Sequence, residues 1–582
     1  MKKRLTSWLL VLTMIVSLIP STLITASAAD VTGITNELTF DETGVANITR
    51  DSSYILTGDQ NGKIVKISDG TTATLLLRNV TMESATSPIQ LGENATLTLI
   101  VADDSVNTIK CNATEVTTDG ESANNGMTAG IHVPASATLI IDTPEGQVGG
   151  DKANGQLAVT GGYGGAGIGG KAAVGYDADN KAATSAAGVQ GGASSMNFGR
   201  YHIWPTPAAQ GVEGGRAGNN AEAAGTITIK SSVLTAAGGY GAAGIGGGMG
   251  ATGEAGQAGN IGGKSATQGL SGGVGHNGGP AVYGCSGGGS GSAGGTGGTG
   301  GAGGAGGNVT ISGGTITATG ANGAAGIGGG IGGFGGAGGV GGQGADGSPT
   351  YDDRTYGGYE GLGRQGGGGM GGTGGFGGIG GVGGSGGSLT ISGGTVNATG
   401  TEVGIGGGQG GVGGQGGTGG TGGWGTIGAN VGEGKRIGGK EIVDKLNNGE
   451  KEIVAESAGG RPGWGGTGGN GGASAALRIS GGSITANGNT NRVGGNIGGA
   501  TGQKGDWGTA GKGPNGEGIQ YWKDGYTNAV AYYYGTIEVW AGGWGAMTTA
   551  VDEPDRTTKS GAAAGITIDG THQDTNETNI WT

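Results

Sequence analysis

The chain is poor in the residues on which many secreted or catalytic folds depend. It has two cysteines, Cys111 and Cys285, which lie in different segments; they form either one bridge or two unpaired thiols. Its four histidines show no metal-ligand spacing. The sequence shows no Cys–His arrangement of the kind used in nucleophilic catalysis. We therefore expect a protein that is not an enzyme.

Basic residues are also scarce. The 30 Lys and Arg residues stand against 43 Asp and Glu, which gives a net charge of −13. Nucleic-acid binding depends on cationic contacts to phosphates, so this balance argues against a nucleic-acid partner. It is compatible with cation binding or with simple solubility.

Long hydrophobic runs are missing except at the start of the chain. Lys2, Lys3 and Arg4 precede an apolar run over 8–19, and small residues follow at 26–29. This pattern predicts a secretory signal peptide over residues 1–29, and hence a secreted, extracellular protein. The alternative, a membrane anchor, needs a longer run, so we expect no transmembrane insertion.

Glycine, in contrast, accounts for 157 of 582 residues, while proline accounts for 11. Collagen needs abundant proline and one glycine in every three residues, so it is excluded. The phrase AGIGG or a relative recurs at Ile168, Ile245, Ile327 and Ile405, and a degenerate copy occurs at Ile497. Each copy follows a short alternating segment such as VTISGGTITATG, whose apolar residues predict two half-buried strands joined at the SGG corner.

Short repeated strands with glycine corners predict an all-β fold, a right-handed parallel β-helix or solenoid with glycine-rich arms inserted between its rungs. Residues 30–160 show the same strand pattern without glycine tracts; a β-sandwich is the alternative there. The glycine-rich repeats of about 80 residues occupy 161–502. An aromatic-rich region, 503–582, follows as a C-terminal cap.

One stretch carries a resemblance to a known family. It reads LLLRNVTM, SPIQLGENATLTLIVADDSVNTI, AGIHVPASATLII and LAVTGGYGGAGIGG. It resembles the carbohydrate-binding β-helix domains of secreted proteins from anaerobic gut and cellulolytic bacteria, which are similar to pectate-lyase-type β-helices. The resemblance implies a polysaccharide partner and, as in some members, bound calcium.

The glycine tracts keep a strict Gly-Gly-X phase, as in GGGGMGGTGGFGGIGGVGGSGGS. In a polyglycine-II helix with three residues per turn, every X lies on one edge and bare backbone forms the other two. The tracts resemble the polyglycine-II bundles of snow-flea antifreeze protein and phage tail-fibre adhesins. We expect ordered arms in which Phe376 and Ile379 face a neighbouring arm or the β-helix; a flexible linker is the alternative.

Between each outgoing and returning tract lies a segment unlike those of the other repeats, which we call a tip. The tips contain aromatic rings, which suit stacking on sugar rings, beside Asp side chains that bind hydroxyls. For the segment around 532–540, a cap strand is an equal alternative. The candidate carbohydrate-binding residues are Tyr201, Trp204, Tyr351, Asp352, Asp353, Tyr356, Tyr359, Trp522, Tyr526, Tyr532, Tyr534 and Trp540.

Calcium is the one cofactor for which the sequence offers ligands. Asp103 and Asp104 supply the oxygen atoms that this hard cation prefers. The alternative is a turn in which Asn107 stacks along neighbouring rungs.

The sequence therefore predicts a secreted, adhesin-like protein that binds a polysaccharide or cell-surface glycan without catalysis. A purely structural extracellular matrix protein is the alternative. A polysaccharide lyase would need a basic residue beside calcium, and none is evident.

Overall fold

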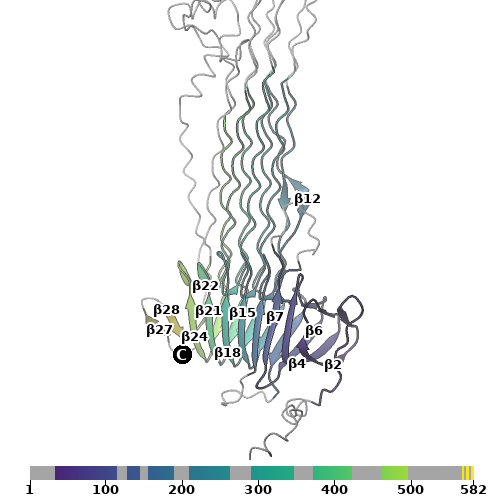
Figure 1. Cartoon of the computed structure of the whole chain (residues 1–582). Coiled ribbons are helices and arrows are strands. Elements are labelled where there is room, and N and C mark those ends of the chain that lie inside the picture. Colours follow the sequence, from purple (N-terminus) through teal and green to yellow (C-terminus); the bar gives the residue numbers. More distant parts are fainter. Residues whose placement is uncertain are drawn as a thin grey trace, which may run out of the picture.

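The computed structural model describes residues 33–114, 127–144, 155–188, 209–262, 290–345, 371–421 and 461–495, together with the backbone of three short strands between 567 and 581. The part of the chain described in this way contains strands and no helix. Nearly all of the strands pair in parallel (Figure 1). The all-β, parallel class predicted from the sequence is confirmed. The predicted signal peptide, residues 1–29, lies outside the described residues.

One sheet has nine strands, each paired in parallel with the next. They are β1 (Val45–Ile48), β3 (Ile64–Ile67), β5 (Ile89–Leu91), β8 (Ile131–His132), β11 (Ile168–Gly169), β16 (Ile245–Gly246), β19 (Ile327–Gly328), β22 (Val403–Gly406) and β25 (Asn491–Gly494).

The second sheet consists of two adjoining ladders. The first contains β2 (Ser52–Asp59), β4 (Thr72–Ser84), β6 (Thr96–Val101), β9 (Thr138–Asp142), β14 (Thr226–Ile229), β17 (Asn308–Ile311), β20 (Ser388–Ile391), β23 (Ala476–Ile479) and β26 (Thr567–Ile568). The second begins at the end of β4 and contains β7 (Val106–Cys111), β10 (Gln156–Thr160), β15 (Val233–Ala237), β18 (Thr315–Thr319), β21 (Thr395–Thr399) and β24 (Ser483–Asn487).

Glycine corners join these two ladders in three repeats, whereas the corner between β14 and β15 holds Ser231 and Ser232, and Ser232 has φ 125°. Gly314, Gly394 and Gly482 have φ values of 88°, 85° and 93°, which L residues rarely adopt. In the N-terminal region, Asn79 within β4 has φ 51° and lies where the pairing of β4 passes from β6 to β7. The SGG motif is therefore a corner imposed by backbone conformation.

Apolar side chains from both sheets form one continuous core. Val309, Ile311, Ile316 and Ala318, which the alternating pattern placed inside, are all buried. Ile168, Ile245, Ile327 and Ile405 stack in register on the nine-stranded sheet and join the same core. Strands of 33–160 pair without interruption to those of the later repeats, as β7 to β10 and β10 to β15. This continuity of parallel pairing argues against a separate antiparallel sandwich.

The last repeat differs from the prediction. Ile405 pairs with Val493, four residues before the Ile497 that the sequence motif indicated. The ladder of β24 ends on an antiparallel strand, β28 (Thr578–Trp581), which also pairs with β27 (His572–Thr575). The aromatic segment at 532–540, the alternative cap strand, lies outside the described residues.

Candidate binding surfaces on the glycine tracts

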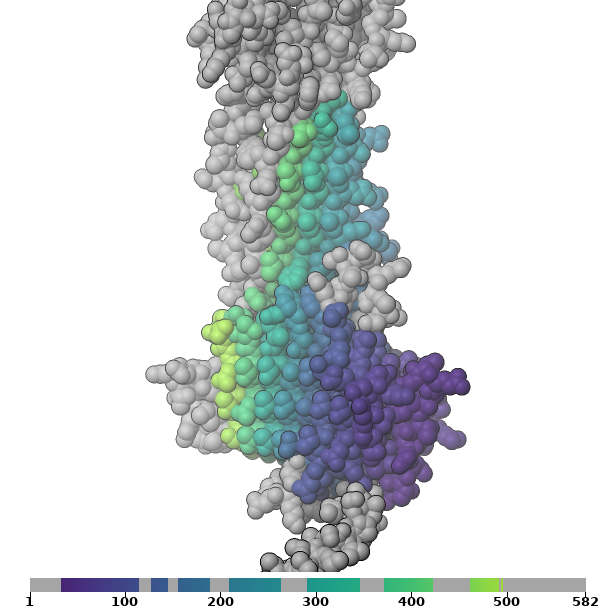
Figure 2. All heavy atoms as spheres, viewed as in Figure 1, coloured from purple at the N-terminus to yellow at the C-terminus, as the bar shows by residue number. Residues whose placement is uncertain are grey.

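Six glycine-rich tracts run side by side away from the sheets (Figure 1). Three outgoing tracts, residues 247–262, 329–345 and 407–421, follow β16, β19 and β22. Three returning tracts, residues 290–306, 371–387 and 461–475, lead back to β17, β20 and β23. In Figure 2 the described atoms of the bundle change from blue to green across the visible face, so neighbouring tracts follow one another in sequence order.

The two glycines of each triplet have different partners. The amide of Gly377 donates to the carbonyl of Trp464 in the next returning tract, at 2.8 Å. The amide of Gly378 donates to the carbonyl of Gly336 in an outgoing tract, at 2.7 Å. The same two hydrogen bonds, one to the next returning tract and one to an outgoing tract, recur every third residue. The tracts therefore form two layers, outgoing and returning, joined by backbone hydrogen bonds.

Glycine is required at these positions because neighbouring backbones occupy the space of a side chain. A Cβ on Gly377 would lie 2.0 Å from the carbonyl oxygen of Gly414, and one on Gly378 would lie 2.0 Å from that of Gly298. At the third residue of each triplet, X, no neighbouring backbone occupies the space of the side chain. The repeated Gly-Gly-X phase is thus the pattern that lets two edges of each tract meet other backbones.

The X residues point toward solvent, and this corrects one prediction. Phe376, Ile379 and Val382 remain 52%, 50% and 47% exposed, so Phe376 and Ile379 are not buried against a neighbouring arm or the sheets. The expectation assumed that large apolar side chains would be covered. The glycine backbone itself makes the contacts between tracts, which leaves the X edge free.

The outer surface of the returning layer, which we call the return face, is a regular grid of X residues. Each glycine after an X donates to the X carbonyl of the next tract, as Gly297 does to Phe376 and Gly377 does to Trp464. These bonds set Thr296, Phe376 and Trp464 side by side. The three central rows of the grid consist of Thr296, Thr299 and Ala302, then Phe376, Ile379 and Val382, then Trp464, Thr467 and Asn470. The same bonds add one row at each end, Ala293, Thr373 and Arg461 at one and Ala305, Ser385 and Ala473 at the other.

Where the tracts leave the sheets, a small apolar cluster holds their base. Tyr163 and Tyr240 stack with ring centroids 5.0 Å apart, and Tyr240 meets Phe334 edge-on at 6.4 Å. Met249 and Ile331 are buried against the same group. Side chains thus anchor the tracts near the sheets, whereas backbone bonds hold them together farther out.

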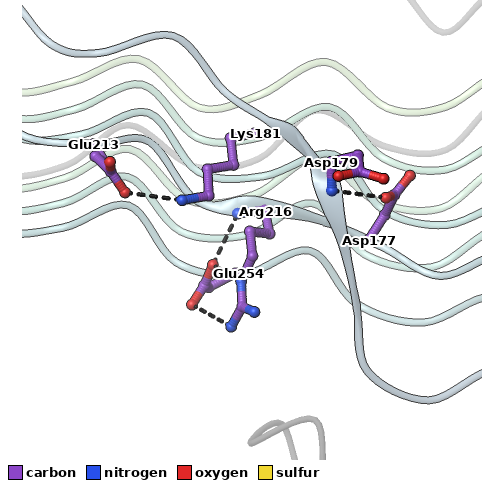
Figure 3. Close-up of polar contacts among 6 residues, drawn as sticks. All are labelled: Asp177, Asp179, Lys181, Glu213, Arg216 and Glu254. Carbon is purple, nitrogen blue, oxygen red and sulfur yellow. Dashed lines mark hydrogen bonds and ion pairs between the residues drawn. The ribbon is translucent and has the colours of Figure 1, made fainter.

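Charged side chains line one edge of the bundle. A short hairpin of β12 (Tyr176–Lys181) and β13 (Arg216–Gly218) lies there (Figure 1). The Nζ of Lys181 lies 3.0 Å from a carboxylate oxygen of Glu213, and the Arg216 guanidinium bonds both carboxylate oxygens of Glu254, at 2.8 and 3.1 Å (Figure 3). Charged, paired side chains at an edge oppose the addition of further strands. We infer that these ion pairs prevent further strands from adding to this edge.

Another polar contact joins the segment before β14 to the nine-stranded sheet. His132, on β8, is buried, and its Nε2 lies 3.1 Å from an oxygen of Glu222, just before β14. Burial by itself raises the pKa of Glu222, but the hydrogen bond with His132 and the charges of His132 and Lys171 outweigh it and lower the pKa. The carboxylate is therefore stabilised in its ionised form.

A pH dependence follows from this pair. Because the folded pKa of Glu222 lies below the ordinary value of about 4.3, its stabilising effect is complete above that value. It is lost as the pH falls through the lowered pKa. We expect Glu222→Gln to lower the melting temperature at pH 7 and to reduce the further drop between pH 5 and pH 3. Glu42→Gln, at an exposed position, is the control; equal acid sensitivity in wild type and Glu222→Gln would contradict this role.

The sequence-predicted candidate sites fall mostly outside this region. All twelve candidate carbohydrate-binding residues, from Tyr201 to Trp540, lie outside the described residues, so that assignment stays a prediction. Asp103 and Asp104 lie in a turn, where Asp104 has φ 55°. The described residues contain no group of three or more His, Cys, Asp or Glu side chains placed to hold a metal ion. Calcium at Asp103 and Asp104 also stays a prediction.

Asn107, which the turn interpretation expected to stack along neighbouring rungs, lies on β7 and makes hydrogen bonds to its neighbours. Its side chain is buried; its oxygen accepts from the amide of Val80 at 3.0 Å, and its nitrogen donates to Ser105 and to the carbonyl of Gln156. The amide therefore bridges three neighbouring strands.

Two further sequence expectations concern the thiols and the membrane. Cys111 is buried, and burial raises the pKa of its thiol; Cys285 lies outside the described residues, so pairing is untested. Within the described ranges, no helix has the length and apolar character to cross a bilayer.

Comparison with known proteins adds little. No family model matches the chain, and no curated protein matches it. Among solved structures, a polysaccharide lyase-like protein from C. thermocellum, as a gadolinium derivative, matches with 15% identity over 65% of this chain and 79% of that chain, at a TM-score of 0.23. At that TM-score the likeness supports neither a shared fold nor a shared function.

Proposed function

We propose that this protein is a secreted, non-catalytic polysaccharide-binding protein of the adhesin type. In this proposal the two sheets close into a right-handed parallel β-helix, and the tracts form a polyglycine-II bundle that serves as a stalk. The tips, which include Tyr351, Tyr356 and Tyr359, are carried at the far end of the stalk.

The observation that supports this proposal is the hydrogen bonding between tracts. Glycine amides bond at every third residue from Gly372 to Gly384, so the tract is held along its whole length. With about 3.1 Å per residue, 17 residues of such a helix span roughly 50 Å. A flexible linker would not need that register, whereas a stalk that presents binding segments does.

A glycan array with the mature protein tests the function. We expect binding to at least one polysaccharide, and we expect Tyr351→Ala, Tyr356→Ala and Tyr359→Ala together to weaken it without changing the melting temperature. Wild-type protein that binds no glycan, with normal thermal stability, would favour the structural matrix alternative. A tyrosine variant that melts several degrees lower while binding normally would show that the tips are structural.

A further inference from the structure

The return face carries an apolar strip one tract wide. Phe376, Ile379 and Val382 lie in line on one tract and are each about half exposed. Along this line the X residues recur every three residues, a spacing of roughly 9 Å in a three-fold extended helix. The strip is therefore straight, narrow and accessible.

The neighbouring tracts border this strip mostly with polar side chains. Thr296 and Thr299 lie on one side, and Thr467 and Asn470 lie on the other, at the levels set by the bonds of Gly297, Gly300, Gly380 and Gly383. Thr299 and Asn470 are exposed, and Thr296 and Thr467 are half-buried. At four of the six flanking positions the apolar centre is therefore bordered by groups that donate and accept hydrogen bonds. The other two positions hold Ala302, beside Val382, and the half-buried Trp464, beside Phe376.

The three central rows of the grid carry no charge. The tracts 290–306 and 371–387 contain no ionisable side chain, and the tract 461–475 contains one, Arg461, at its end. The ion pairs of the bundle lie elsewhere, at the hairpin edge (Figure 3). An uncharged surface offers no compensation for desolvating an ionic ligand, so its partner is neutral.

A second copy of the chain fits this surface poorly. The exposed halves of three apolar side chains amount to about 250 Å². Each partner in a stable protein interface buries about 800 Å², with an apolar core that is wider than one row of side chains. The strip is too narrow to form such a core.

We propose that the return face binds a neutral polysaccharide chain laid lengthwise along the tract of Phe376, Ile379 and Val382; this inference rests on the proposed polysaccharide-binding function and names its ligand class and site. A flat sugar ring presents C–H groups on its face and hydroxyls at its rim. The C–H faces contact the apolar strip, and the rim hydroxyls bond Thr296, Thr299, Thr467 and Asn470. The Phe376 ring supplies the aromatic contact that sugar faces favour.

The test compares retention of the full mature protein on amorphous cellulose, a neutral polysaccharide, and on polygalacturonate, an anionic one. The return-face variant combines Phe376→Ser, Ile379→Thr and Val382→Thr, which keep every glycine. The matched control combines Val340→Thr and Val412→Thr on the outgoing layer, where these residues are 49% and 38% exposed. Circular dichroism and light scattering establish that fold and mass are unchanged.

We expect the return-face variant to lose at least tenfold in retention on cellulose, while the control and Phe376→Tyr retain wild-type binding. Wild-type retention by the return-face variant, or binding of the wild type to polygalacturonate alone, would overturn the inference and leave the proposed function standing. If the wild type is a dimer, and the return-face variant is a monomer with lower retention, the return face mediates self-association instead. Wild-type protein that is retained on no polysaccharide would refute the proposed function, and this inference with it.

Discussion

Replacing Gly378 by alanine is expected to destabilise the tract bundle by about 3 kcal/mol, the upper end of what overpacking usually costs. The new Cβ would lie 2.0 Å from the carbonyl oxygen and 2.7 Å from the carbonyl carbon of Gly298. Gly298 cannot move aside freely, because its own amide donates to the backbone carbonyl of Glu254 at 2.7 Å. Hydrogen exchange of peptides from 371–387 should rise together with a lower melting temperature.

The adjacent residue provides the control. Ile379→Asp places a charge on the same tract, but at a side chain that is half exposed, so we expect a change within about 0.5 kcal/mol. Two results would contradict this assignment of one edge to neighbouring backbone and the other to solvent. One is wild-type hydrogen exchange in Gly378→Ala, and the other is a larger loss of stability in Ile379→Asp than in Gly378→Ala.

The second large effect is expected at Asn107. Asn107→Ala leaves the amide of Val80 and the carbonyl of Gln156 without the partners that now lie at 3.0 and 3.1 Å. An unsatisfied buried polar group costs about 1–3 kcal/mol. The Val80 amide is buried and the Gln156 carbonyl is only partly buried, so we expect a total loss of about 2–3 kcal/mol. Chemical denaturation measures this difference.

Its neighbour Val106 serves as the matched position. Val106 is 57% exposed, so Val106→Ala should change stability by no more than about 0.5 kcal/mol. Equal stability of Asn107→Ala and wild type would mean that water replaces the lost hydrogen bonds, and that the side chain does not clamp the strands.

The strands were predictable because burial of one face makes apolar and polar residues alternate along the sequence. Val309, Ile311, Ile316 and Ala318 alternate with Thr and Ser, and all four are buried. The SGG corners were predictable because few residues other than glycine adopt the φ of Gly314 or Gly394. Where the motif degenerates, the sequence indicates Ile497, but Ile405 pairs with Val493, and Ile497 lies outside the described residues.

The surfaces were harder to predict. Phe376 and Ile379 were expected to be buried from their hydrophobicity, and each is about half exposed. The contact of His132 with Glu222 joins residues 90 positions apart, and no local pattern marks it. The edge pairs of Lys181 with Glu213 and of Arg216 with Glu254 also depend on how distant segments align.

The sequence by itself determined the parallel all-β class, the corners and the Gly-Gly-X phase, because each of these follows from steric rules that act within a few residues. Only the tertiary structure decided which edge of each tract meets backbone and which meets solvent. That choice depends on the bonds of Gly377 to Trp464 and of Gly378 to Gly336, which join segments 87 and 42 residues apart. The periodic glycine pattern predicts that two edges of each tract lack side chains, but the backbones that cover those edges come from other repeats.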